Sequence, residues 1–240
     1  MTLPGGDGGF PLQEKALDSK LRSIIQAAVR APSSHNTQPW RFTATDVGIS
    51  LYADRARALP ANDPNDRELV ISCGCALMNL RAAAAQEGYG AVLSILPSAA
   101  DEDHLATLTL VKASAAGAED AKLYPAIEER RTYRKRFDSR GVTGEIMTAL
   151  QAAAGAEGAW LHVLDGEKAR HDTARLVGEG DAVQWANPGW RRELARWMHP
   201  RRKGDGLTVP GLVAPVAQAV VRTFDMGNGV GAKDTELAEG

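Results

Sequence analysis

Residues 31–42, Ala31-Pro-Ser-Ser-His-Asn-Thr-Gln-Pro-Trp-Arg-Phe42, are the stretch from which the fold of this chain is best interpreted. Pro32 ends the helical pattern before it, because a proline disfavours helical backbone in the preceding residue. Pro39 favours extended backbone leading into a strand. Between the two prolines stand the polar side chains of Ser33, Ser34, His35, Asn36 and Gln38.

This polar stretch has two interpretations. Its backbone N–H and side-chain amide groups can lie along the edge of a flat heterocyclic ligand that alternates donors and acceptors. Alternatively, it is a capped turn in which serine and asparagine side chains bond their own backbone. The residue types alone favour the capped turn.

The sequence around this stretch predicts alternating helices and strands. A helix over 12–30 follows from apolar residues at three- and four-residue steps, and a second over 67–87 ends at Gly88. Strands are predicted over 40–45, 49–53, 91–96 and 106–112 from their apolar runs and short turns. The faces of the two helices consist of Leu17, Leu21, Ile24, Ile25, Ala28, Leu69, Cys73, Leu77, Leu80 and Ala84.

The second half has weaker patterns. Helices are predicted over 123–131, 145–154, 167–177 and 191–198, with a strand over 160–164. After His199 the chain is basic and glycine-rich, which indicates a loop. Residues 25–31 and 150–156 share a Gln-Ala-Ala core, and a strand beginning with tryptophan is predicted after each. Alanine-rich helices match by chance, so this repeat alone leaves a duplication open.

A basic segment lies near the middle of the chain. Five of the seven residues 130–136 are cationic. Arg130, Thr132 and Arg134 alternate, so in an extended backbone they would face one side and clamp an anion such as a phosphate. The alternative is a solvated charge run that pairs with nearby carboxylates. The clustering of the cations favours the anion site.

Composition excludes several classes of protein. The 240 residues carry 28 Lys plus Arg and 30 Asp plus Glu, a net charge of −2, which argues against nucleic-acid and polybasic membrane binders. A hydrophobic share of 44% is typical of a soluble globular protein. The N-terminus has no signal-peptide pattern, so we expect a cytoplasmic protein that is not a membrane protein. The two cysteines, Cys73 and Cys75, form a bare C-x-C, so no metal site is expected.

The two polar segments together resemble the nitroreductase family of flavin enzymes. Those proteins carry a Pro-Ser-x-x-Asn-x-Gln-Pro-Trp loop and an Arg-x-Ser/Thr-x-Arg/Lys motif. In ordinary members the arginine motif comes first, whereas here the order is reversed and each motif occurs once. That order resembles the twin-domain, Acg-type branch, in which one chain is similar to a fused dimer. The strings over 54–81 and 191–207 resemble that branch too.

The resemblance implies an α+β fold of two fused, half-similar domains, each with helices around a mainly antiparallel sheet. The expected organisation is a disordered arm over 1–11, a first half over 12–118 and a second half over 119–240. Related chains continue past the last ten residues, so the second half is expected to be incomplete. One composite FMN site is implied. Its phosphate would be bound by Arg130, Thr132 and Arg134, and its isoalloxazine ring would be lined by Pro32, Ser33, Ser34 and Asn36.

The implied activity is that of an FMN-dependent oxidoreductase, which passes a hydride from NAD(P)H through FMN to a nitroaromatic or quinone-like acceptor. No catalytic side chain is assigned. The alternative is a protein that binds or sequesters FMN without turnover, and a third possibility is a remnant that binds no flavin. The expected partners are NAD(P)H and a small aromatic acceptor, and the chain is expected to be a monomer or homodimer.

Overall fold

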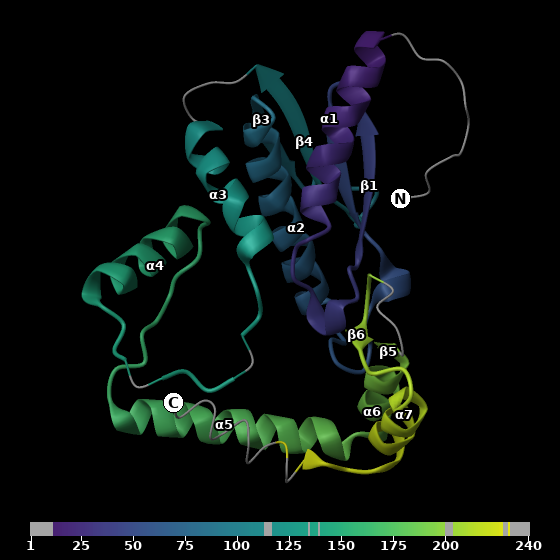
Figure 1. Ribbon diagram of the computed structural model, residues 1–240, viewed down its shortest axis with the longest axis vertical. Coiled ribbons are helices and arrows are strands. Elements are labelled where there is room, and N and C mark those ends of the chain that lie inside the picture. The colour runs from purple at the N-terminus through teal and green to yellow at the C-terminus, as the bar shows by residue number, and fades with distance from the viewer. Residues whose placement is uncertain are drawn as a thin grey trace. The chain divides into compact units, whose positions relative to one another are not determined.

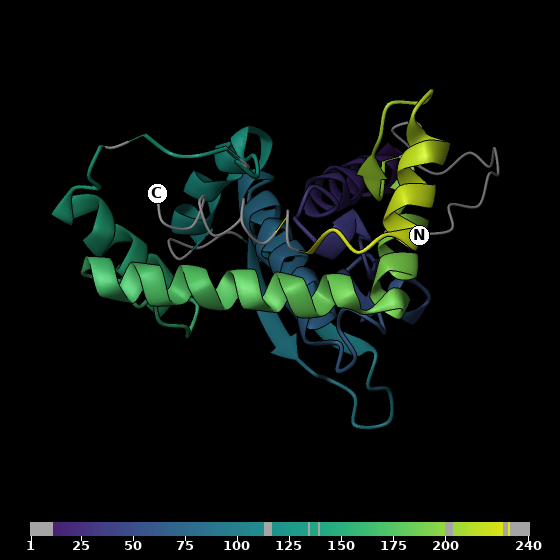
Figure 2. The same cartoon turned by 90° about the horizontal axis from the view of Figure 1, so that it is seen from below.

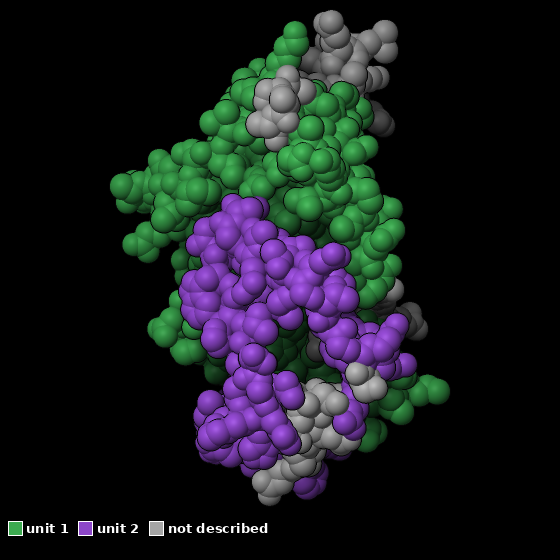
Figure 3. Space-filling view, turned by 90° about the vertical axis from the view of Figure 1, so that its left-hand side faces the viewer, with its two compact units in different colours: residues 1–131, 193–218 green, residues 132–192, 219–240 purple. Residues whose placement is uncertain are grey.

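The computed structural model describes residues 12–112, 117–133, 135–138, 140–199, 204–227 and 230. The expected arm over 1–11 lies outside these residues. The chain divides into two compact units, coloured separately in Figure 3. The first comprises residues 1–131 and 193–218, and the second comprises residues 132–192 and 219–240. Each unit is described on its own.

The first unit contains the helices and strands that the sequence predicts most clearly. The predicted element boundaries around the polar stretch are confirmed to within a few residues. Helix α3 begins earlier than the predicted residue 123. The elements are α1 (Leu12–Ala28), η1 (Ser34–Asn36), β1 (Trp40–Thr45), β2 (Gly48–Ala53), η2 (Arg55–Arg57), α2 (Arg67–Gln86), β3 (Tyr89–Ile95), β4 (His104–Lys112) and α3 (Gly117–Glu129).

The four strands form one antiparallel sheet in the order β1-β2-β4-β3. Phe42 lies opposite Leu51, and Ile49 lies opposite Leu108, so apolar residues of neighbouring strands share one face. Arg41 and Thr43 alternate with them and are exposed on the other face. Such alternation is typical of an antiparallel sheet with one buried face. Together with the helices of this unit, the sheet confirms a mixed, α+β arrangement.

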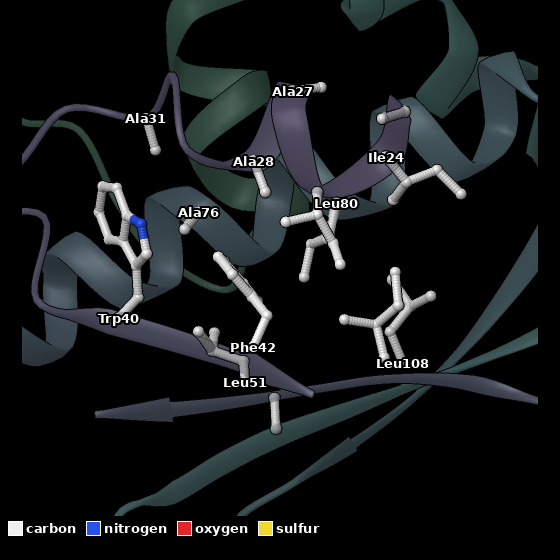
Figure 4. Packing of buried hydrophobic residues seen from close by; sticks show 14 of the residues in the cluster. Ile24, Ala27, Ala28, Ala31, Trp40, Phe42, Leu51, Ala76, Leu80 and Leu108 are labelled. Atoms are coloured by element: carbon white, nitrogen blue, oxygen red, sulfur yellow. The ribbon is translucent and has the colours of Figure 1, made fainter. Parts of the chain in front are cut away.

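The core lies between that apolar face and the helices. Helix α2 packs against α1, α3 and three of the strands (Figure 1). Figure 4 shows Ile24 and Ala28 of α1 and Leu80 of α2 meeting Phe42 and Leu108 from the strands. Helix α2 is the one described helix long and apolar enough to cross a membrane, and one face of it, which includes Leu69, Cys73 and Leu80, belongs to this core.

The later part of the first unit differs from the predicted loop after His199. Strands β5 (Met198–His199) and β6 (Leu207–Thr208) pair in parallel. Helix α6 (Pro188–Arg196) leads into β5, and helix α7 (Ala214–Thr223) follows β6; residues 193–196 and 214–218 of these helices belong to the first unit. Helix α7 was not predicted, because its apolar stretch is short and follows a glycine-rich segment that indicates a loop.

Helices are the regular elements among the described residues of the second unit. Helix α4 (Gly144–Ala156) confirms the helix predicted over 145–154, and α5 (Glu167–Ala186), the long helix in Figure 2, extends well past residue 177. The predicted strand over 160–164 is wrong: these residues are irregular and Trp160 is 83% exposed. A strand requires a neighbour that accepts its backbone hydrogen bonds, and no described strand lies beside this segment. The two halves, 12–118 and 119–240, therefore stay a prediction.

Leu80 tests the core. Its side chain is 0% exposed, so Leu80→Ala should lower the free energy of unfolding by about 2–5 kcal/mol through lost burial and a cavity. The matched control is Leu212→Ala, because Leu212 is 99% exposed. The same truncation there should change the free energy of unfolding by less than about 0.5 kcal/mol. Urea unfolding followed by circular dichroism measures both. Equal midpoint shifts would contradict the packing described.

The two thiols should differ in reactivity. Burial raises the pKa of Cys73 to about 12, and burial also raises the pKa of Cys75, where the nearby Arg130 guanidinium opposes the increase. The thiolate is the reactive form, so Cys75 should react first with a disulfide reagent at pH 8 and Cys73 only after unfolding. Removing each cysteine by substitution with alanine assigns the phases. A fast reaction in the folded Cys75→Ala variant would show that Cys73 is accessible.

Candidate functional site

Residues 33–38, here called the polar loop, connect α1 to β1. Their position is fixed because the residues around them enter the core. Ala31, Thr37, Pro39 and Trp40 are buried, and the Cys73 thiol of α2 donates to the Pro39 carbonyl oxygen at 3.2 Å. The side chains from Ser33 to Asn36 and that of Gln38 are half-buried. The polar loop is therefore accessible to a ligand while its ends are held by the core.

The backbone of the polar loop is strained. His35, Asn36 and Gln38 have φ values of 51°, 54° and 53°, in the left-handed region that most residues avoid. Such conformations persist where surrounding contacts determine them, and they cluster at functional sites. Within the loop, the N–H groups of Asn36 and Thr37 donate to the carbonyl oxygens of Ser33 and Ser34 at 2.9 and 3.0 Å. These two bonds join backbone groups, whereas the capped turn favoured by the residue types would bond serine and asparagine side chains to their own backbone.

Other loop groups bond to carboxylates and to neighbouring segments. The Ser34 hydroxyl donates to Glu68, which also accepts from the Asn62 side chain at 3.0 Å. The Gln38 N–H donates to the Ser33 hydroxyl oxygen at 2.9 Å. A turn that served only its own backbone would not need the carboxylate of Glu68. The polar loop is thus tied to the first turn of α2.

A segment from much later in the chain lies on the polar loop. We call residues 204–206, Gly-Asp-Gly, the strap; they precede β6, which Figure 1 shows in yellow-green beside the chain that leaves α1. The Asn36 side-chain nitrogen donates to the Gly206 carbonyl oxygen at 3.1 Å, and the Gly206 N–H donates to the Asn36 carbonyl oxygen at 2.8 Å. The Gln38 side-chain nitrogen donates to the Gly204 carbonyl oxygen.

Arg57 links the polar loop to the strap. Its Nη1 atom donates to the Thr37 carbonyl oxygen at 2.9 Å and to the Asp205 carboxylate at 2.7 Å. Its Nε atom lies 3.4 Å from the Asp54 carboxylate. A surface pocket of about 460 Å³ opens beside this guanidinium. Its lining residues are Asp54, Ala56, Arg57, Arg196, Trp197, His199 and Asp205.

Glu193 makes a second link from the late segment. Its two carboxylate oxygens accept from the N–H groups of Ala61 and Asn62 at 3.0 and 2.9 Å. Burial lowers the pKa of His35, although the carboxylates of Glu193 and Glu68 oppose that decrease. The His35 imidazole is therefore neutral at pH 7, with one ring nitrogen able to donate and the other able to accept.

The structure brings together only some of the residues that were expected at the FMN site. The structure brings Ser33, Ser34 and Asn36 together in the polar loop, and exposed Pro32 precedes it. Arg130, which follows α3, is exposed and donates through Nη2 to the Arg30 carbonyl oxygen at 3.2 Å. Thr132 is exposed in the second unit. Arg134 lies outside the described residues.

Sequence reasoning missed several residues that shape this site. Arg57, Glu68 and Glu193 hold the polar loop and its surroundings, and so does the strap. A signal was present, because the strings over 54–81 and 191–207 contain all of them. Neither string shows by itself that it contacts the polar loop.

Comparison with known proteins supports the resemblance. No family model matches the chain. Protein Rv3131 of Mycobacterium tuberculosis (strain H37Rv) is 33% identical over 180 residues, which are 74% of this chain and 50% of that protein. Acg of the same strain is 28% identical over 194 residues, covering 81% and 58% of the two chains. PigM of Serratia sp. (strain ATCC 39006) is 27% identical over 221 residues, covering 83% and 58%.

Each of these three relatives bears the provisional name NAD(P)H nitroreductase. The chain spans about half the length of the curated relatives it matches. Relatives from two bacterial genera match most of this chain. The chain belongs to the nitroreductase family.

Proposed function

We propose that this protein is an FMN-dependent oxidoreductase that transfers a hydride from NAD(P)H through FMN to a nitroaromatic or quinone-like acceptor. The observation that carries the proposal is the 33% identity over 74% of the chain with a relative named as an NAD(P)H nitroreductase. The half-buried polar loop supports it by offering donors and acceptors at one place. We further propose one composite FMN site per chain, in a twin-domain, cytoplasmic protein.

The donor set of the polar loop fits the edge of an isoalloxazine ring, which alternates hydrogen-bond donors and acceptors. Asn36 uses one side-chain N–H toward Gly206, and its amide oxygen takes no hydrogen bond from the described residues. Ser33, Ser34 and Asn36 would hold the ring, with Pro32 lining its rim.

The phosphate would be held by Arg130, Thr132 and Arg134. The Arg130 guanidinium uses Nη2 toward Arg30, which leaves further N–H donors of the group for an anion. Bonds between arginine and phosphate are charge-assisted and stronger than neutral ones. The Arg-x-Thr-x-Arg spacing is therefore suited to this role.

Bound FMN supplies the hydride-transfer chemistry, and the protein supplies binding, orientation and electrostatics. The chain's donors near the ring edge would stabilise negative charge that develops there on reduction. Asn36 can do this with the second N–H of its side-chain amide. We assign no general acid.

A second function, FMN binding without turnover, is favoured by one observation. The strap bonds to the side chains of both Asn36 and Gln38, so the late segment covers part of the polar loop. If NAD(P)H cannot reach the ring past this segment, FMN would be bound and not reduced.

Absorption spectra test both functions. The purified chain titrated with FMN should show the shifted flavin bands of bound FMN and saturate at one FMN per chain. Added NADH or NADPH should then bleach these bands without oxygen, and a nitroaromatic or quinone should restore them. Binding without bleaching would replace the oxidoreductase with the second function. A chain that leaves the FMN spectrum unchanged would overturn both.

The phosphate clamp predicts a difference between two flavins. Arg130→Ala removes a charge-assisted contact worth roughly 1.5–3 kcal/mol, so FMN should bind about tenfold or more weakly. Riboflavin, which lacks the phosphate, should bind as tightly as to the parent protein. The matched control is Arg131→Ala, because Arg131 has the same charge and lies outside the alternating set. Fluorescence titration measures all affinities, and an equal loss for both flavins would remove Arg130 from the clamp.

A further inference from the structure

The strap forms hydrogen bonds with both the backbone and the side chain of Asn36. Asn36 accepts from the Gly206 N–H at its main-chain oxygen and donates to the Gly206 carbonyl oxygen from its side chain. Such a two-point contact fixes both the position of Asn36 and the rotation of its amide. The Gln38 side chain makes a single bond to Gly204, which holds a second amide at one point.

Gly206 can be replaced by no other residue without displacing the strap. Its φ is +71°, and an added Cβ atom would overlap the His199 ring and lie 2.6 Å from the Trp197 carbonyl oxygen. The residues after Gly206 are held by two backbone hydrogen bonds. The Leu207 N–H donates to the Trp197 carbonyl oxygen at 2.7 Å, and the Val209 N–H donates to the His199 carbonyl oxygen at 2.9 Å. The strap is thus pressed between β5 and the polar loop.

A charged side chain, that of Arg57, also connects the polar loop to the strap. The Arg57 guanidinium bridges the Thr37 carbonyl oxygen and the Asp205 carboxylate, and both partners are partly shielded from water. Asp205 also lies 3.5 Å from the His199 ring nitrogen. The polar loop and the strap therefore share one charged partner.

The strained backbone of the polar loop makes these contacts necessary. Left-handed conformations at three non-glycine residues persist only where the surroundings determine them. The backbone bonds within the polar loop join residues that are only three positions apart. The strap adds the long-range contacts at Asn36 and Gln38, two of the three strained residues.

We propose that the strap is a positioning element for the flavin ring: Gly206 holds Asn36 in its ligand-binding orientation before the ligand arrives. The inference rests on the proposed function, because FMN is the ligand. Its physical basis is preorganisation, in which a loop already ordered loses less conformational freedom on binding. Gly206 is a positioning residue and contacts no reacting atom.

Gly206→Ala tests the strap, and Gly158→Ala is the matched control. Gly158 has the same φ of +71°, and its added Cβ atom would meet nothing within 4 Å, so both variants bear the same backbone strain and only one has the clash. Amide hydrogen exchange without ligand is measured first. The peptide covering 33–40 should exchange about tenfold or more faster in Gly206→Ala and at the parent rate in Gly158→Ala.

FMN binding is measured next on the same proteins. Gly206→Ala should weaken FMN binding about tenfold by loss of the preset geometry, and at saturating FMN it should shift the flavin midpoint potential. Gly158→Ala should leave both at the parent values. Asp205→Asn, which removes the charge and keeps the side-chain volume, serves if Gly206→Ala fails to fold. Asp205→Asn should also speed the exchange of the peptide covering 33–40 and weaken FMN binding, each by a smaller factor than Gly206→Ala.

The outcomes separate the inference from the function on which it rests. Parent-like exchange of residues 33–40 in both strap variants would overturn the inference whatever FMN does. Faster exchange with parent-like FMN affinity and potential would also overturn it. A parent protein that binds no FMN would overturn the proposed function and the ligand assigned to the strap, while the exchange data would still decide whether the strap holds the loop.

Discussion

The packing of α2 against the sheet is the contact on which the rest of the first unit depends. Helices α1 and α3 and strands β2, β3 and β4 all contact α2. Its buried face includes Ala76, Ala83 and Ala84, whose small side chains let neighbouring elements approach closely. The same helix begins where the Asp63 carboxylate accepts from the Leu69 N–H at 2.9 Å. The polar loop is placed by this core, because its flanking residues are buried against it.

The polar loop shows how a core and a distant segment share the stabilisation of one conformation. A left-handed non-glycine residue costs about 1–3 kcal/mol, and a single neutral hydrogen bond contributes about 0.5–1.5 kcal/mol. The turn's own bonds are therefore insufficient for three such residues within four positions. Bonds to Glu68, Arg57 and the strap supply the difference, and several of them involve charged groups. These long-range bonds constrain the backbone of the polar loop.

The two copies of the sequence repeat have different structures. Residues 25–31 lead from α1 toward β1, and Trp40 is buried in the core. Residues 150–156 lie in α4, where Leu150 is exposed, and the following Trp160 is exposed as well. A strand pattern becomes a strand only beside another strand, and α2 and β2 provide that environment for the first copy alone among the described residues.

The sequence by itself determined the helices and strands between residues 12 and 112, and it indicated the family. The signals that mark these elements are local: Pro32, Pro39, Gly88 and the spacing of apolar residues on α1 and α2. Each acts through the backbone preferences of the residues next to it, so it can be recognised without the tertiary structure. Only the tertiary structure decided that residues 160–164 form no strand, and that Asn36 bonds to Gly206, a residue 170 positions later. Hydrogen bonds between distant segments depend on how the core places both partners, and no local pattern records that placement.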